Sequence, residues 1–336
     1  MTDIIIKSFN RPFYLDRCLQ SIYRFVKGDF KIIILDDGTP QKYLDKIQKK
    51  YPEIEIRLSE QHDFKVQSIK ENLETGKEID GFKIPIQLWY DTVKQASDYV
   101  LVTEDDVWFT NEIELNSRID DMKINSIHLL KIGRLKQSIS KNLNNISNEI
   151  YSSVPSKVWT APMPIMDWFM FNKFKFFSIL YRLKLVDNET KKTYWSLNSI
   201  LMGLWKKEYW LYVWKDNDEK VDEQMQLRNA ALWYRKNKSN KNYIASTKTS
   251  HLKTTFQSSA TNSYHQYGFD FDVNYFNYLM NEAWFEGEFD SMQNFPKDFS
   301  LDYFDSFIDE RIDPKSFHLW VEKFKNQYRK MGADVD

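Results

Sequence analysis

The sequence predicts an α/β fold built on a mainly parallel, doubly wound sheet with helices on both faces. In the first 110 residues, short β-branched runs alternate with longer segments whose apolar residues recur at helical spacing. This alternation is typical of parallel sheets, whose strands are connected through helices. Polar residues follow three of the runs directly, as SFNRP, LDDG and TEDD. Because ligands of such sheets bind at the carboxyl ends of strands, these three turns are candidates for a binding site.

The elements of this first part follow one another in a regular order. Proline suits the first turn of a helix, so a helix is expected to begin at Pro12, directly after the first strand. The expected strands are 3–7, 31–35, 54–58 and 99–103, and the expected helices are 12–25, 41–50 and 84–97.

The second part of the chain gives a looser pattern. We expect a strand at 127–132, and a loop with a strand at 158–171, where proline and aromatic residues mix. The helices expected here are 172–185, 219–235 and 314–330.

These patterns divide the chain into a sheet domain and an extension. The sheet domain is expected to comprise residues 1–251, with a regular half at 1–110 and a looser half at 111–251. Residues 252–336 are aromatic and acidic, and we expect a mostly helical extension that packs on the sheet domain or closes over its site.

Composition and charge exclude several classes of protein. The 336 residues include 47 Lys and Arg against 48 Asp and Glu, and this net charge of −1 argues against a nucleic-acid-binding protein. The only cysteine, Cys18, allows neither an intrachain disulfide nor a cysteine-based zinc site, which fits a reducing, cytoplasmic compartment. We expect no signal peptide and no membrane span, because no apolar stretch has the required length.

Three consecutive acids, Glu104, Asp105 and Asp106, follow the last strand of the regular half. Carboxylate oxygens are the ligands that Mg²⁺ and Mn²⁺ prefer, and such an ion stabilises the charge that develops on a leaving diphosphate. The alternative is a solvated turn or a helix N-terminus, where acids are favoured without any ligand. Together with the two upstream motifs, the acids favour a metal site.

The three strand ends, taken in order, resemble the opening of the family 2-like glycosyltransferases with a GT-A fold. The resemblance rests on IIIKSFNRPFYLDRCLQSI, IIILDDGT and VLVTEDD, and it covers residues 1–110 well and 220–252 moderately. It implies a Rossmann-like GT-A domain that transfers a sugar from a nucleotide sugar, with a UDP-sugar as the favoured donor. It also implies a divalent metal cofactor, Mn²⁺ or Mg²⁺.

The same resemblance assigns roles to the strand ends. Asp37 would accept a hydrogen bond from the imide N–H of uracil or thymine, and Phe9 would stack on the ring. Asp106 or Asp105 would bind the metal ion, with Glu104 nearer the sugar. The donor-binding residues that it implies are Ser8, Phe9, Arg11, Asp36, Asp37, Glu104, Asp105 and Lys253. The alternatives are a simple Asp-Gly turn for LDDG and core packing for Phe9.

KVDEQMQLRNAALWYRKNK resembles the family's helix that carries the catalytic base. Asp222 and Glu223 stand at its start, where a helix N-terminus stabilises the anionic form of an acid. One of them would take the proton of the acceptor hydroxyl in an inverting displacement. Asp222 is slightly preferred, although the family order is often Glu-Asp, so the choice is open. The alternative is an ordinary acidic helix cap.

Three later features carry further expectations. By resemblance, His251 would be a metal ligand or contact the diphosphate beside Lys253, although a lone histidine is as often structural. Trp168 would stack on an acceptor sugar, the alternative being an aromatic core. The segment NKFKFFSILYRLKL alternates basic and apolar residues, so it either lies peripherally on an anionic membrane or packs as a surface helix.

The acceptor is expected to be a glycan, a polysaccharide or a lipid-linked molecule. Three other functions are less favoured by the sequence. A GT-A-fold sugar nucleotidyltransferase usually carries a Gly-rich loop with a basic residue after the first strand, and KSFNRP lacks it. A non-catalytic nucleotide- or carbohydrate-binding module ranks low because the acids are present. A Rossmann oxidoreductase is disfavoured because no GxGxxG follows the first strand.

Overall fold

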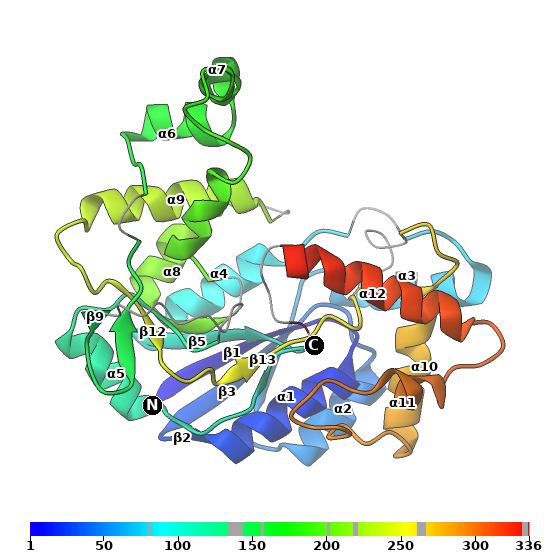
Figure 1. Ribbon diagram of the computed structural model, residues 1–336. Coiled ribbons are helices and arrows are strands. Elements are labelled where there is room, and N and C mark those ends of the chain that lie inside the picture. The colour runs from blue at the N-terminus through cyan, green and yellow to red at the C-terminus, as the bar shows by residue number, and fades with distance from the viewer. Residues whose placement is uncertain are drawn as a thin grey trace.

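A nine-stranded mixed sheet runs through the centre of the computed structural model (Figure 1). The structure describes residues 1–79, 82–133, 144–155, 158–199, 202–217, 221–260, 267–330 and 335. Across the sheet, the strands are β4 (Glu55–Leu58), β3 (Phe30–Asp36), β1 (Thr2–Ser8), β5 (Tyr99–Glu104), β11 (Gly203–Lys206), β8 (Leu129–Lys131), β12 (Ile244–Thr247), β10 (Ile150–Ser152) and β9 (Asn144–Asn145).

The sheet is parallel in its first half and mixed in its second. β4, β3, β1 and β5 are parallel neighbours, as predicted. β11 is antiparallel to both β5 and β8, and β10 and β9 are also antiparallel to their neighbours. The α/β fold class is therefore confirmed. The uninterrupted run of parallel neighbours ends at β5, and the regular alternation of strands and helices ends at the same place in the sequence.

All three predicted helices of the first half are present, and two segments of the chain differ from the prediction. α3 (His62–Thr75) forms in a segment for which no element was predicted. α6 (Met163–Met170) replaces the predicted loop and strand, because its prolines stand at the helix start, where they are tolerated. The other helices of the regular half are α1 (Pro12–Phe25), α2 (Gln41–Lys50) and α4 (Ile86–Gln95).

The remaining elements surround this sheet. They are β2 (Val26–Lys27), β6 (Trp108–Phe109), β7 (Ile113–Glu114), α5 (Leu115–Ile124), η1 (Lys173–Lys175), α7 (Phe176–Arg182), η2 (Lys191–Leu197), α8 (Lys207–Trp214), α9 (Glu223–Lys236), β13 (Leu252–Lys253), α10 (Val273–Glu286), α11 (Leu301–Asp305) and α12 (Pro314–Lys330). None of the described helices is both long and apolar enough to cross a membrane.

The sheet divides the hydrophobic core into two clusters. Side chains alternate between the faces of a strand, so Ile4 and Ile6 of β1 join one cluster and Ile5 joins the other. The first cluster includes residues of α1, α10 and α12, and the second includes residues of α6, α8 and α9. The two clusters fix the helices that carry site residues on opposite faces of one sheet.

The C-terminal helices are built into the first cluster. Phe304 and Trp320 are fully buried in the cluster that contains Ile4. Trp284 of α10 donates its indole N–H to Asp16 of α1 over 3.0 Å. The packing is thus continuous across residue 251. The division of the chain at this residue into a sheet domain and an extension stays a prediction.

Candidate functional site

The carboxyl ends of β1, β3 and β5 lie at one edge of the sheet, because these strands are parallel neighbours. The strand register pairs Lys7 with Glu104 and Ser8 with Asp36. The three turns singled out from the sequence are therefore brought together.

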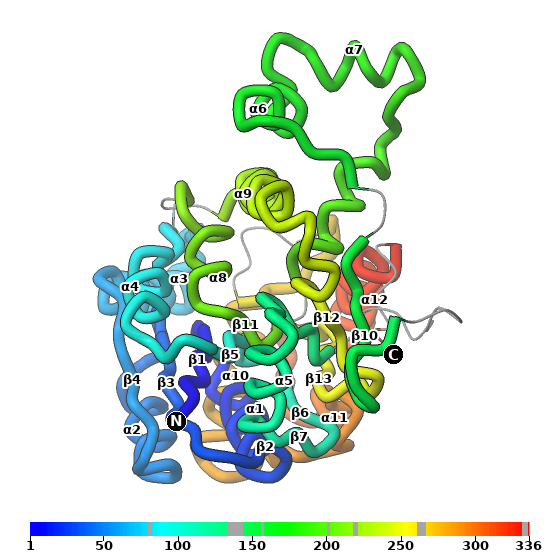
Figure 2. The backbone as a smooth tube through the Cα atoms, turned by 90° about the vertical axis from the view of Figure 1, so that its left-hand side faces the viewer, coloured from blue at the N-terminus to red at the C-terminus, as the bar shows by residue number. Residues whose placement is uncertain are grey.

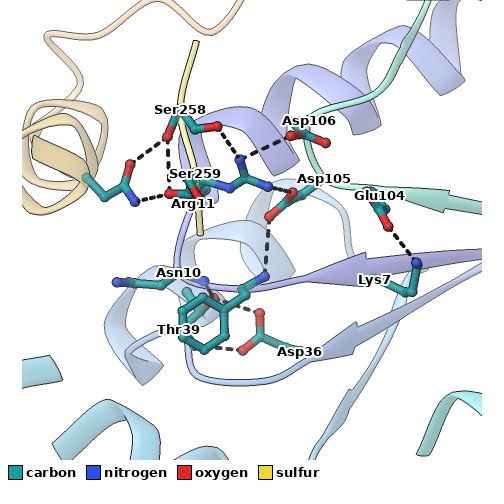
Figure 3. A network of polar contacts seen from close by, with 12 residues as sticks. Lys7, Asn10, Arg11, Asp36, Thr39, Glu104, Asp105, Asp106, Ser258 and Ser259 are labelled. Atoms are coloured by element: carbon teal, nitrogen blue, oxygen red, sulfur yellow. Dashed lines mark hydrogen bonds and ion pairs between the residues drawn. The ribbon is translucent and has the colours of Figure 1, made fainter. Parts of the chain in front are cut away.

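Each of the three consecutive acids makes an ion pair with a cation from β1 or the turn after it (Figure 3). The Arg11 guanidinium lies between Asp105, at 2.5 Å, and Asp106, at 3.1 Å. Lys7 Nζ lies 2.5 Å from Glu104 Oε1. Three carboxylates thus share two cations, so one negative charge is left uncompensated when all three acids are ionised. Lys7 is the cation that sequence reasoning did not assign to the site.

The two candidate metal ligands differ in what already surrounds them. Asp105 is buried, and its second oxygen accepts the Phe9 backbone N–H over 3.3 Å. Burial raises the pKa of Asp105 to about 7, against the opposing effect of Arg11. Asp106 lines a cavity, and burial raises its pKa as well. Asp106 therefore has the more open carboxylate, whereas both oxygens of Asp105 have partners.

The cavity beside Asp106 has a volume of about 420 Å³. Its charged lining residues come from three elements that are far apart in the sequence, and they are Lys7, Arg11, Glu104, Asp106 and Glu223. Although burial acts to raise the pKa of Glu104, Lys7 and Arg11 hold this pKa below its ordinary value. The volume is within the range of small-molecule sites in proteins.

Aromatic side chains form a further part of the wall of the same cavity. Trp195 of η2, Trp214 of α8 and Tyr328 of α12 all line it. The Tyr328 ring stacks on Phe256, with ring centroids 3.6 Å apart and planes at 5°. Burial, followed by Asp106 and Glu104, raises the pKa of Tyr328, so its hydroxyl stays protonated. Sequence reasoning missed this wall, because its residues belong to segments for which only composition was informative.

The two acids at the start of α9 face different surroundings. Asp222 is the helix N-cap, and its side chain accepts the Met225 backbone N–H over 3.0 Å. Glu223 lines the cavity. Loss of hydration and then the Asp222 charge raise the pKa of Glu223. Glu223, and not the slightly preferred Asp222, therefore lines the cavity, and the choice of base between them stays a prediction.

A second cavity, of about 680 Å³, adjoins the first, since Ile84 lines both. Asp37 lines this second cavity with Ser59 and Phe64. Lys65 holds the Asp37 carboxylate at 2.5 Å, while burial raises the pKa of Asp37. An acid in this position can accept a hydrogen bond from a ligand N–H group.

Asp36, Ser8 and Phe9 support the turn and line neither cavity. The Asp36 carboxylate accepts the Thr39 backbone N–H at 2.8 Å and the Thr39 hydroxyl at 2.6 Å. Gly38 has a φ of +152°, and a Cβ atom there would lie 3.0 Å from the Phe9 ring. Both Ser8 and Asp36 are buried. In this structure their contacts support the turn, and the direct donor contacts that the resemblance implies stay predictions.

Three predicted residues lie outside both cavities. His251 donates its backbone N–H to Ile132 O over 2.7 Å, and its ring lies at 3.4 Å from Asn111 O. Lys253 pairs in β13 with Trp108, two residues beyond Asp106. Trp168 packs edge-on against Phe174, with ring centroids 5.7 Å apart. Their roles stay predictions, and the structure does not bring them to the cavity walls.

The donor set fits a divalent ion that is completed by a ligand's phosphates. Among the described residues there is no group of three or more His, Cys, Asp or Glu side chains able to hold a metal ion. Mg²⁺ commonly binds through one or two carboxylates, with phosphate oxygens and waters supplying the rest. Asp106 and Glu104 offer this smaller set, and the uncompensated negative charge beside them favours a cation.

Comparisons with known proteins agree with these features. Residues 3–74 match the family model described as Glycosyl transferase family 2. No curated protein sequence matches the chain.

Several solved structures match the chain at low sequence identity. S. aureus TarS 1–349 is 13% identical over 97% of this chain and 73% of that chain, with a TM-score of 0.40. The same protein in complex with UDP-GlcNAc is 13% identical over 99% of this chain and 90% of that chain, with a TM-score of 0.42. The galactosyltransferase LgtC, in complex with donor and acceptor sugar analogs, is 11% identical over 73% of each chain, with a TM-score of 0.35.

Proposed function

We propose that this protein, a family 2-like glycosyltransferase with a GT-A fold, is a metal-dependent, inverting enzyme that uses a nucleotide sugar. A UDP-sugar is the favoured donor, and the acceptor is a hydroxyl of a glycan, a polysaccharide or a lipid-linked molecule. One observation carries the proposal: a single cavity joins the strand-end charges, including Asp106 and Arg11, to the helix-start acid Glu223.

The strand-end side of the cavity suits the donor. Lys7 and Arg11 place two positive charges where a diphosphate would lie. Asp106, with Glu104, would hold Mn²⁺ or Mg²⁺. When bound, the ion neutralises charge on the leaving diphosphate as a Lewis acid. In the adjoining cavity, Asp37 would accept the imide N–H of the base.

Glu223 acts as the general base in this proposal. Its carboxylate takes the proton of the acceptor hydroxyl while that oxygen attacks the anomeric carbon. The bond between the anomeric carbon and the diphosphate oxygen breaks as the new glycosidic bond forms, so the configuration inverts. A raised pKa suits the role, because a base works best when its pKa approaches the working pH.

Calorimetric titration with UDP, in the presence and absence of Mn²⁺, tests the donor assignment. We expect metal-dependent binding that Asp106→Asn weakens by about tenfold or more, which corresponds to about 1.4 kcal/mol. Asp302→Asn is the matched control, because Asp302 is an exposed acid on α11, outside both cavities. If no nucleoside diphosphate binds in the presence of Mn²⁺, the proposed function is wrong.

A further inference from the structure

The segment from α6 through α7, residues 163–185, extends from the molecule beyond α9 (Figures 1 and 2). We call it the α6–α7 projection. No residue of η1 or α7 is buried. Phe174 is 80% exposed, Leu185 68% and Leu183 63%. Large apolar side chains normally lie inside proteins, and exposed apolar patches mark interaction surfaces.

Positive charge accompanies these exposed apolar residues. From Trp168 to Leu185 the sequence contains no acid, and its four cations are Lys173, Lys175, Arg182 and Lys184. The nearest acid along the chain, Asp167, lies 3.2 Å from Arg228 of α9 and 3.7 Å from Lys173. The projection is therefore a local basic region on a chain whose net charge is −1.

The tip of the projection has a defined and strained backbone. Asn172, Phe174 and Lys175 have positive φ values of 51°, 55° and 57°. Left-handed conformations of non-glycine residues are costly, at about 1–3 kcal/mol each. The Asn172 and Ser178 groups exchange two hydrogen bonds, of 2.9 and 3.1 Å, that close the turn. This turn presents Phe174 to solvent between two lysines, an arrangement that internal packing does not require.

We propose that the α6–α7 projection is a docking surface for membranes that contain anionic lipids. Apolar side chains such as Phe174 and Leu183 would enter the interfacial region, and the neighbouring lysines and arginine would contact phosphate headgroups. Self-association through this surface is disfavoured, because a symmetric contact would bring the same cations of two copies together.

The projection is linked physically to the cavity. It packs on α9, which begins at Glu223, through the pair between Asp167 and Arg228. The chain then continues into η2, whose Trp195 lines the cavity. Docking would therefore hold the acceptor side of the cavity near the lipid surface. This last step rests on the proposed function and favours a lipid-linked acceptor, whereas the docking surface itself does not depend on it.

Vesicle co-sedimentation tests the docking surface. We expect the full chain to bind phosphatidylcholine vesicles that contain phosphatidylglycerol, to bind pure phosphatidylcholine weakly, and to dissociate as salt increases. Phe174→Ser with Leu183→Ser should lower partitioning by about tenfold or more. Lys173→Glu with Lys175→Glu should abolish the preference for phosphatidylglycerol.

Matched control variants test whether a loss of vesicle binding is specific to the α6–α7 projection. Ile124 on α5 is 81% exposed, so Ile124→Ser removes an equally exposed apolar side chain elsewhere. Lys49→Glu reverses an exposed charge on α2. Both controls should bind vesicles as the original chain does. Circular dichroism and UDP calorimetry should be unchanged in all variants, so a failure of docking is distinguishable from a failure of the proposed function.

Three outcomes would overturn the docking proposal. The first is no binding to vesicles with phosphatidylglycerol. The second is binding that the projection variants leave unchanged. The third is a dimer in sedimentation velocity that Phe174→Ser with Leu183→Ser dissociates, because this would assign the surface to self-association.

Discussion

Two groups of acids face the same cavity, and their surroundings differ. The strand-end acids Glu104 and Asp106 line it, and they make ion pairs with Lys7 and Arg11, respectively. Glu223, at the start of α9, makes no ion pair with any residue that the structure describes, and its pKa is raised. Burial raises the pKa of Asp106 as well, but the ion pair with Arg11 fixes that carboxylate in place, whereas no described cation holds the Glu223 carboxylate. The presence or absence of a neighbouring cation therefore distinguishes the strand-end acids, which we propose to bind the metal ion, from Glu223, which we propose to accept a proton.

The strongest challenge to this comparison is Glu223→Gln. If Glu223 is the base, kcat should fall by about 10²–10⁴-fold, the usual contribution of general base catalysis. UDP binding should be unchanged, because the strand-end pairs remain. Steady-state transfer assays and calorimetry measure the two effects. If this variant keeps full turnover, Glu223 is not the general base.

Replacing Arg11, the cation shared by Asp105 and Asp106, tests the role of the ion pairs at the strand ends. Arg11→Ala leaves Asp105 and Asp106 without their partner, and breaking such a buried pair costs about 3–5 kcal/mol of unfolding free energy. Urea denaturation without divalent metal measures this loss. Arg11→Lys, which keeps the charge without the planar fork, should lose less stability. Equal losses in the two variants would mean that the charge contributes nothing.

The aromatic wall makes a third, smaller prediction. Trp195→Ala should raise the acceptor KM by up to about tenfold, since aromatic contacts contribute about 0.5–1.5 kcal/mol. Trp168→Ala should leave the KM of a water-soluble acceptor unchanged, because Trp168 does not line the cavity. UDP binding should be the same in both. The reverse pattern would place acceptor recognition on the α6–α7 projection.

The smallest expected effect concerns pH. Loss of hydration, and then the Asp222 charge, raise the pKa of Glu223, and the active form is the carboxylate. Activity is therefore lost as pH falls through this pKa. Asp222→Asn removes the neighbouring charge and keeps a side-chain cap, so the acid limb of kcat/KM should move to lower pH. A limb that stays in place or moves to higher pH would contradict the assignment.

The sequence was most informative where local patterns determine structure. The strands that became β1, β3, β4 and β5 were predictable, because buried parallel strands leave short β-branched runs and their ends meet at one edge. The pair between Lys7 and Glu104 was not, since it joins residues 97 positions apart. The choice between Asp222 and Glu223 also depended on structure, because neighbouring residues point about 100° apart around a helix.

The aromatic wall and the projection show a different limit. Trp195, Trp214 and Tyr328 meet only because η2, α8 and α12 pack around one cavity. The spacing of these three residues in the sequence does not predict that they lie together. For the basic apolar segment, the sequence left a packed surface helix and a membrane contact equally open. In the structure, Phe176, Phe177 and Leu180 of α7 pack against the second core cluster although none of them is fully buried, so α7 is a packed surface helix, and a membrane contact of its exposed face stays a proposal.

Both ends of the chain line the same cavity, with Lys7 on the first strand and Tyr328 on the last helix. This arrangement has a consequence for the order of folding. The parallel strands β1, β3, β4 and β5 can pair once residues up to Glu104 have been synthesised, whereas the cavity is complete only after α12 docks. We expect the nascent protein to form the parallel part of its sheet early and to complete the cavity last.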